Sequence, residues 1–354
     1  MKYFKENIRA IEPYKPVALS SLNRLDANES PYNIANQFTE DDIRSLLSIN
    51  FNHYPDGSSN ELKTAISKYS DVSEECILCG NGSDELIKII FDSTIAPGDK
   101  ILIHTPTFSQ YSLNAQISNA SVIEVSSKKD MSVDIDQIIK IACAEKPKLI
   151  FLCTPNNPTG SLIPLSDIEK TLENTDAFVV VDEAYFEFCG LSIADKIQKY
   201  PNLIVLRTLS KAFGLAGLRI GYLISSTTNI DFLNRVRMPY NINSFSSKLA
   251  VLALSREASI HQIVLEIIKE RDRMETILNS LSGIKLYKSN GNFLFFYSDY
   301  ADQIQSKLIQ KNIGIRKFSS EILRNTLRIT IGKSEINEIV INTIKEVLSN
   351  VQTS

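Results

Sequence analysis

The chain has 354 residues, of which 43% are apolar and 22% are charged, a composition typical of soluble globular proteins. Its 38 lysines and arginines nearly balance its 41 aspartates and glutamates, and no basic run stands out, which excludes nucleic acid and anionic membranes as expected partners. The longest apolar runs have the length of strands rather than of membrane spans, and the N-terminus lacks the apolar segment of a signal peptide. We therefore expect a cytoplasmic protein. Its length exceeds the roughly 250–300 residues at which a single core stops growing, which predicts two domains.

The first part of the chain predicts an arm followed by an α/β domain. Mixed polarity and the prolines Pro13, Pro16 and Pro31 indicate an extended arm over residues 1–30. Short apolar runs then alternate with segments of helical periodicity, which predicts a mostly parallel sheet with helical layers in a large domain of residues 31–245. The expected strands cover residues 76–79, 100–104, 121–125, 148–153, 177–182, 203–208 and 218–224, and the expected helices cover residues 59–69, 83–94 and 132–145.

Cysteines suggest no special chemistry. Their number is five, an odd count that fits a reducing compartment. Cys76 and Cys79 form a CxxC pair, but no second pair or nearby histidine completes a metal site. We interpret the pair as part of a buried strand that enters a turn, and we expect no metal.

A second, smaller α+β domain is expected over residues 246–354. A long helical region runs from about residue 246 to about residue 281, and a last helix covers residues 335–349. Between them lie segments typical of strands, at residues 284–287, 292–297, 314–318 and 327–332.

Chemically unusual residues follow several predicted strands, at the edge where open α/β sheets bind ligands. Backbone N–H groups at Ser83, Asp84 and Glu85 could hold a phosphate, although a helix start capped by Ser83 explains this segment nearly as well. Asn157, in CTPNNPTG, either occupies an ordinary loop or bonds a ligand oxygen. Asp182 ends an apolar run, where it either forms a salt bridge with an arginine or pairs with a cationic ring nitrogen.

The segment TLSKAFGLAGLRIGY, residues 208–222, brings these sites together. Tight turns explain its glycines but give Ser210, Lys211 and Arg219 no task. A single ligand that touches all these loops needs a phosphate, a ring cation, a ring oxygen and an aldehyde that condenses with an amine. Pyridoxal phosphate has these groups, and Phe108, just past another strand, could stack on its ring.

The motifs, taken in order, resemble those of fold-type I pyridoxal-phosphate enzymes, specifically the class-II aminotransferases, and within them the histidinol-phosphate aminotransferases. The similarity covers nearly the whole chain. Its motifs are NIRAIEPYKP, LDANESPY, HYPDG, GNGSDELI, PNNPTG, VVDEAY, TLSKAFGLAGLRIGY, PYNINSFS, GIRKF and LRITIG. The resemblance implies an α/β fold with a large cofactor-binding domain and a small C-terminal domain.

The resemblance also implies a role for each candidate residue at the cofactor. Lys211 would condense with the cofactor aldehyde and later move a proton between substrate Cα and cofactor C4′. An ordinary lysine pKa of ~10.4 would make it a poor base, so desolvation and cationic neighbours should lower that pKa. Asp182 would keep the ring nitrogen protonated. Tyr185 and Asn157 would contact the ring oxygen. The phosphate would be held by Ser210, Arg219 and the amides of Ser83, Asp84 and Glu85. Phe108, where many relatives have tyrosine, would stack on the ring face.

The implied partners are a second subunit and two substrates. Tyr54, in HYPDG, matches a tyrosine that in the family reaches the cofactor phosphate of the neighbouring subunit, which implies a homodimer with shared active sites. Glutamate (or 2-oxoglutarate) and histidinol phosphate would share one pocket in histidine biosynthesis. Arg328 would grip the substrate anion as a fork, and Arg316 and Tyr14 would add phosphate recognition.

Three alternatives stay open from the sequence. Arg316 could be an ordinary surface arginine. The activity could also be that of an aminotransferase for aromatic or other amino acids, or that of a threonine-phosphate decarboxylase of the same fold. Motifs around Lys211 do not separate these activities, because they serve the cofactor rather than the reaction.

Overall fold

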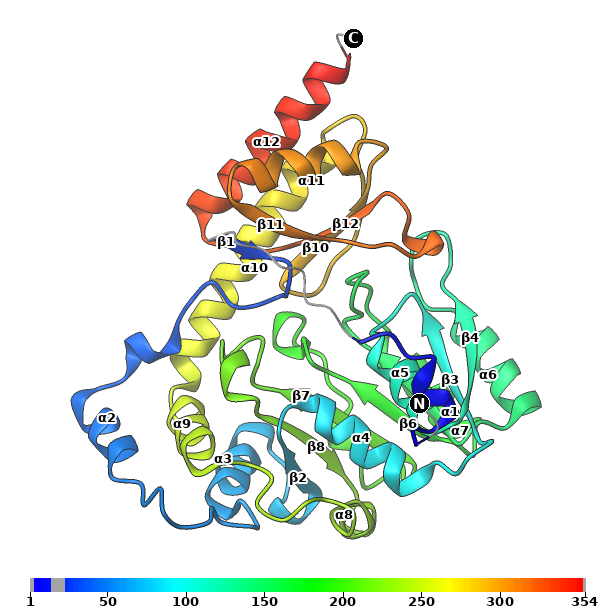
Figure 1. Cartoon of the computed structure of the whole chain (residues 1–354), viewed down its shortest axis with the longest axis vertical. Helices are drawn as coiled ribbons and strands as arrows, with labels where there is room; N and C mark the ends of the chain where they lie inside the picture. The colour runs from blue at the N-terminus through cyan, green and yellow to red at the C-terminus, as the bar shows by residue number, and fades with distance from the viewer. Residues whose placement is uncertain (1–2, 14–22, 353–354) are drawn as a thin grey trace.

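The structure is a computed structural model that describes residues 3–13 and 23–352. Two sheets lie toward opposite ends of the molecule, and the long helix α10 (Glu257–Asn279) runs between them (Figure 1). Three further α-helices are α1 (Glu6–Arg9), α2 (Glu40–Leu47) and α9 (Ser244–Leu254). The short helix α1 lies against the large part of the molecule, where the Asn7 side chain donates to the carbonyl of Gln116 at 2.7 Å.

The larger sheet has seven strands in the order β2-β8-β7-β6-β5-β3-β4. The pairs from β7 to β4 are parallel, whereas β8 is antiparallel to both β7 and β2. The strands are β2 (Ile77–Gly80), β3 (Lys100–Thr105), β4 (Ser121–Ser126), β5 (Leu149–Cys153), β6 (Phe178–Asp182), β7 (Leu203–Thr208) and β8 (Gly221–Ser225). The mostly parallel sheet expected from the apolar runs is confirmed.

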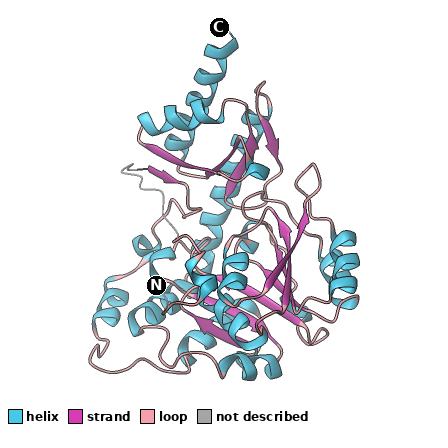
Figure 2. Cartoon of the chain, turned by 45° about the vertical axis from the view of Figure 1, so that its right-hand side comes forward, coloured by secondary structure: helices cyan, strands magenta, loops and turns pink. Residues whose placement is uncertain are grey.

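Both faces of this sheet are buried because successive side chains of each strand point to opposite faces. In β6, Val179 and Val181 belong to one hydrophobic core and Val180 belongs to the other. Helices lie on both faces, as Figure 2 shows. The first core includes residues of α3 (Asn60–Ser70), α6 (Ile135–Glu145) and α7 (Leu165–Glu173), and the second includes residues of α4 (Ser83–Thr94), α5 (Gln110–Ile117) and α8 (Thr227–Asn234).

The smaller sheet has five strands in the order β1-β11-β12-β10-β9. Its strands are β1 (Asn23–Leu25), β9 (Lys285–Tyr287), β10 (Phe293–Tyr297), β11 (Ile313–Lys317) and β12 (Thr326–Thr330), and it packs with α10, α11 (Ala301–Gln310) and α12 (Ser334–Gln352). The small α+β unit is thus as expected. The domain boundaries at residues 30 and 245 stay predictions.

Within the expected extended arm, Asn23–Leu25 forms an edge strand parallel to β11, and its three residues are too few to show a periodic pattern in the sequence. Two other local expectations were wrong. The helical region after residue 246 breaks at Ser255 and Arg256, where the Arg256 guanidinium pairs with Asp42 at 2.6 Å. Strand β8 begins at Gly221 rather than near residue 218, because residues 216–218 form a 3-10 turn.

Within residues 3–13 and 23–352, no helix combines the length and apolarity that crossing a bilayer requires. The same residues contain no group of histidine, cysteine, aspartate and glutamate side chains that could hold a metal ion. Cys76 and Cys79 are buried, and burial raises the pKa of Cys79 to about 12.

Candidate active site

A cavity of about 950 Å³ lies between the two sheets, at the carboxyl ends of β3, β5, β6 and β7. This is the edge at which parallel α/β sheets place their ligands. Most of the residues selected from the sequence line it: Ser83, Asp84, Phe108, Asn157, Asp182, Tyr185, Ser210, Lys211, Arg219, Arg316 and Arg328. The chain therefore brings together side chains that are spread over some 250 positions.

The start of α4 forms an anion-binding end of the cavity. Its N-cap residue is Gly82, which has no side chain to occupy the first N–H groups of the helix. The interpretation of Ser83 as a cap is therefore wrong, and the amides of the first turn can bind an anion. A Cβ atom at Gly221 would lie 2.5 Å from the backbone nitrogen of Ser83, so only glycine lets β8 approach the helix this closely.

Arg219 covers this helix start. Its backbone has the left-handed φ of 56°, and its guanidinium would lie 2.7 Å from a Cβ atom at Gly82. The same guanidinium pairs with Asp84 at 3.0 Å. Ser210 lines the cavity beside it, with its hydroxyl 2.9 Å from that of Thr208. Helix amides, a hydroxyl and an arginine are the donor set that proteins use for a phosphate.

Lys211 lies deeper in the same cavity. Its Nζ donates to the carbonyl of Ala27 at 2.9 Å. Burial and, second to it, the positive charge of Arg328 lower the pKa of Lys211 to about 8, while Glu29 acts in the opposite direction. The expected lowering is present, so a neutral, nucleophilic amine is populated at mildly basic pH.

Asp182 ends β6 with its carboxylate buried. Its Oδ2 accepts from the hydroxyl of Tyr111 at 2.6 Å, and its Oδ1 accepts from the backbone N–H of Ala184 at 3.1 Å. Burial raises the pKa of Asp182 to about 6, against the opposite effect of these two hydrogen bonds. The salt bridge with an arginine that was the alternative for Asp182 is formed by the next residue, Glu183, with Arg207.

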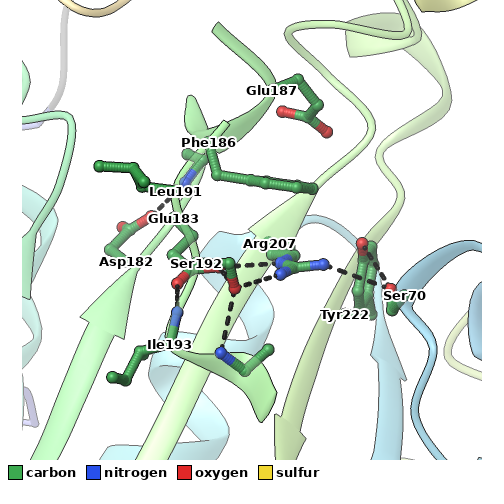
Figure 3. A network of polar contacts seen from close by, with 12 residues as sticks. Ser70, Asp182, Glu183, Phe186, Glu187, Leu191, Ser192, Ile193, Arg207 and Tyr222 are labelled. Carbon is green, nitrogen blue, oxygen red and sulfur yellow. Dashed lines mark hydrogen bonds and ion pairs between the residues drawn. The ribbon is translucent and has the colours of Figure 1, made fainter. Parts of the chain in front are cut away.

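Glu183 and Arg207 form a buried ion pair on the other face of the sheet (Figure 3). Arg207 Nε donates to Glu183 Oε2 at 3.0 Å, and Ser192 bonds both partners. The guanidinium lies 3.8 Å from the centre of the Phe186 ring. The pair joins the end of β6 to β7, so it fixes the strand ends that carry Asp182 and Lys211.

Tyr185 and Asn157 lie on the wall nearest the small sheet. The Tyr185 hydroxyl accepts from the side-chain amide of Asn28 at 2.9 Å, which leaves its own proton available to a ligand. Burial raises the pKa of Tyr185 to about 12, so the phenol stays protonated. Asn157 Oδ1 accepts from Arg328.

Arg316 and Arg328 face the cavity from adjacent antiparallel strands. The two residues are direct partners in the β11–β12 register, so their side chains lie on the same face. Arg328 donates to the side-chain amide oxygen of Asn157 and to the backbone carbonyl of Asp26. Both acceptors are uncharged. Like charges placed opposite each other destabilise a sheet, so this pair would favour an anion bound to both arginines.

Two candidate residues, Tyr54 and Glu85, do not line this cavity. Tyr54 is 82% exposed and stacks on Tyr240, with ring centroids 4.7 Å apart. The Glu85 side chain turns away, accepting from the Asn81 N–H and the Asn241 amide, so only its backbone N–H could serve a ligand there. Tyr14 lies outside the described residues.

Sequence analysis missed Asn28 and Tyr111, which bond two of the proposed site residues. Asn28 lies in LDANESPY, a segment whose residue pattern alone gives the asparagine no role. Tyr111 lies three residues after Phe108, in a segment for which no helix had been predicted.

The residues present fit pyridoxal phosphate. The uncapped start of α4 with Arg219 suits a phosphate, the buried carboxylate of Asp182 suits a ring cation, and Lys211 suits an aldehyde. The face of Phe108 and the hydroxyl of Tyr185 are available to a ring and its oxygen.

Comparison with known proteins agrees with this geometry. Residues 21–344 match the family described as aminotransferase class I and II. The chain is 41% identical to the histidinol-phosphate aminotransferase of Thermoanaerobacter pseudethanolicus, covering 97% of this chain and 98% of that protein. It is 38% identical to the protein of that name from Caldanaerobacter subterraneus, covering 98% of each. The structure of the Sinorhizobium meliloti histidinol-phosphate aminotransferase in complex with pyridoxal 5'-phosphate has the same fold, with a TM-score of 0.89 at 23% identity over 99% of each chain.

Proposed function

Because this chain belongs to the class I and II aminotransferase family, we propose that it transfers the amino group of histidinol phosphate to 2-oxoglutarate. The products are imidazole-acetol phosphate and glutamate, and the reaction belongs to histidine biosynthesis. A cytoplasmic location, expected from the sequence, is part of the same proposal.

The cofactor, pyridoxal 5'-phosphate, supplies an aldehyde that condenses with amines and a protonated ring that accepts the electron pair left at the substrate Cα. The start of α4, Ser210 and Arg219 would hold its phosphate. Asp182 would hold the proton on its ring nitrogen, and Tyr185 and Asn157 would bond its ring oxygen. Phe108 would cover one face of the ring and exclude water from it.

Lys211 carries out the proton transfer. Its amine would hold the cofactor through the aldehyde. When free, the amine would be the base that accepts the Cα proton, and it would carry that proton toward the C4′ side. A pKa of about 8, set mainly by burial and Arg328, lets the amine accept and release this proton near neutral pH.

The choice of substrate rests on the arginine pair. Histidinol phosphate and glutamate share an amine but differ in their anions, since one carries a phosphate and the other two carboxylates. Two arginines at paired positions 316 and 328, both lining the cavity, suit a dianionic phosphate as well as a carboxylate. The relatives that are 38% and 41% identical to this chain are named histidinol-phosphate aminotransferases, which supports histidinol phosphate as the substrate.

Spectroscopy of the two half-reactions tests this function, and Arg316→Ala sharpens the test. Wild-type enzyme mixed with histidinol phosphate should convert its cofactor rapidly to the amine form, and 2-oxoglutarate should restore it. Arg316→Ala should lose about 10- to 150-fold in kcat/KM with histidinol phosphate, because a charge-assisted hydrogen bond contributes ~1.5–3 kcal/mol. The loss with glutamate should be much smaller, whereas Arg328→Ala should weaken both half-reactions.

Two further variants serve as controls. Arg324→Ala removes an exposed arginine outside the cavity lining and should leave both half-reactions unchanged. Arg316→Lys keeps the charge but not the planar fork, so it should recover only part of the loss. Equal losses on both substrates in Arg316→Ala would favour an aromatic or broad-specificity aminotransferase. Release of carbon dioxide from threonine phosphate would favour the decarboxylase.

We further propose a homodimer in which Tyr54 completes the active site of the neighbouring subunit. Tyr54 and Tyr240 are exposed, as are Phe51 and Met238 beside them in the chain. Tyr54→Ala and Lys211→Ala subunits should each be impaired alone. Mixed and allowed to exchange, they should regain activity, because each hybrid dimer contains one site with both wild-type residues. Mixtures no more active than their components, with exchange verified by mass spectrometry, would contradict the shared site.

A further inference from the structure

Tyr111 is a fully buried tyrosine on α5 whose hydroxyl reaches the carboxylate of Asp182. Its ring stacks on Phe151 with centroids 4.4 Å apart, and it meets Phe108 edge-on at 5.7 Å. These two aromatic contacts fix the ring, so the hydroxyl has little freedom. It donates to Asp182 Oδ2 at 2.6 Å, the short distance typical of a hydrogen bond to a charged acceptor.

The other titratable groups around Asp182 do not replace this hydroxyl. Asp84 on α4 and Glu183, the next residue, are acidic and disfavour a negative charge at Asp182. The Cys153 thiol on β5 lies beside the carboxylate, and burial raises the pKa of this thiol first, with the charge of Asp182 second. The Tyr185 phenol, in the same cavity, stays neutral. Among the described groups that affect the pKa of Asp182 most, the Tyr111 phenol and the backbone N–H of Ala184 favour the charged form.

We propose that Tyr111 is a positioning residue that keeps the Asp182 carboxylate charged and directed at the ring nitrogen of the cofactor, an inference that rests on the function proposed above. The hydrogen bond opposes the effect of burial. Without it, the pKa of Asp182 rises above its present value of about 6, and a larger share of the carboxyl groups is protonated at neutral pH. A protonated carboxyl group cannot hold a second proton on the ring nitrogen.

The substitution Tyr111→Phe isolates the hydroxyl, because phenylalanine keeps both aromatic contacts. The full-length protein freed of cofactor should be titrated at pH 7 with pyridoxal phosphate and with its 1-deaza analogue, in which a C–H replaces the ring nitrogen. The ratio of the two affinities reports the ring nitrogen alone. Wild-type protein should prefer pyridoxal phosphate. Tyr111→Phe should reduce this preference by about 2- to 10-fold at pH 7, because a pKa raised by one to two units from about 6 leaves only about a half to a tenth of the Asp182 carboxyl groups charged.

The same variant gives a second readout without cofactor. Carbon-13 NMR of aspartate-labelled protein, with Asp182→Asn to assign the signal, follows the protonation of Asp182 directly. The midpoint should move upward by about one to two pH units in Tyr111→Phe, since the hydrogen bond that is lost favours the charged form.

Tyr222→Phe is the matched control. Tyr222 is also fully buried, but its hydroxyl lies 3.3 Å from Ser70 Oγ in the network of Figure 3 and not at Asp182. This variant should leave the affinity ratio and the midpoint unchanged. An unchanged ratio in folded Tyr111→Phe, or equal losses in both variants, would overturn the inference. A wild-type ratio near one would instead contradict the pairing of Asp182 with the ring nitrogen, and with it this part of the proposed function.

Discussion

Replacing Lys211 with alanine should abolish transamination and the visible absorbance of the lysine-bound cofactor, while leaving a folded protein. One substitution removes the covalent anchor and the proton carrier together. A general base alone accounts for ~10²–10⁴-fold in rate, so the loss of turnover should be at least of this size.

The fold should tolerate the change because Lys211 makes few structural contacts. Its Nζ donates one hydrogen bond, to the carbonyl of Ala27, and it faces the cavity. The phosphate-binding groups at the start of α4 and Arg219 do not depend on the lysine. The variant should therefore still bind pyridoxal phosphate without a covalent bond, which equilibrium dialysis can measure.

Lys211→Arg provides the matched control for this experiment. Arginine keeps the positive charge and a donor for the Ala27 carbonyl, but it stays protonated and does not condense with an aldehyde. A purely structural or electrostatic role would be restored by arginine, whereas the proposed role would not. Turnover near the wild-type rate in either variant would refute the assignment of Lys211.

The sequence predicted those parts of the site that depend on local pattern. Asp182 ends the apolar strand β6 and Lys211 lies three residues after the end of β7, and the position of a strand end can be recognised from the run that precedes it. The alternation of Val179, Val180 and Val181 between two cores also follows from the pattern of a doubly covered sheet.

Contacts between distant segments could not be predicted in this way. The partners in the Tyr111–Asp182 hydrogen bond are 71 residues apart, and those in the Asn28–Tyr185 bond are 157 apart. No periodicity in either segment specifies the partner, because the contact depends on how α5 and the residues after β1 pack on the finished sheet. For the adjacent acidic residues Asp182 and Glu183, the sequence does not show which one pairs with an arginine. Only the direction of each side chain, on opposite faces of β6, decides which one meets the arginine.

Asp182→Asn should fold almost as stably as the wild-type protein and lose more than about 100-fold in kcat, equivalent to ~2.7 kcal/mol. Asparagine has nearly the same shape. Its Oδ1 can still accept from the Ala184 N–H, and the Tyr111 hydroxyl can rotate to accept from the new amide. A neutral amide cannot hold the ring nitrogen protonated, so the electron pair left at Cα has no cationic ring to enter. Steady-state kinetics and thermal unfolding of the same preparation measure the two effects.

Glu183→Gln should instead lose much stability and little kcat. Because Glu183 is also a buried carboxylate, this variant controls for the effect of changing any buried carboxylate. Glu183 is paired with Arg207 at 3.0 Å, and both side chains are almost fully buried. Removing one charge of a buried pair leaves the other uncompensated, at a cost of ~3–5 kcal/mol in unfolding free energy. Because this group points away from the cavity, the folded fraction should keep a much larger share of its kcat than Asp182→Asn does. If Asp182→Asn instead keeps more than a tenth of the rate, or loses stability as Glu183→Gln does, then Asp182 serves the fold rather than the chemistry.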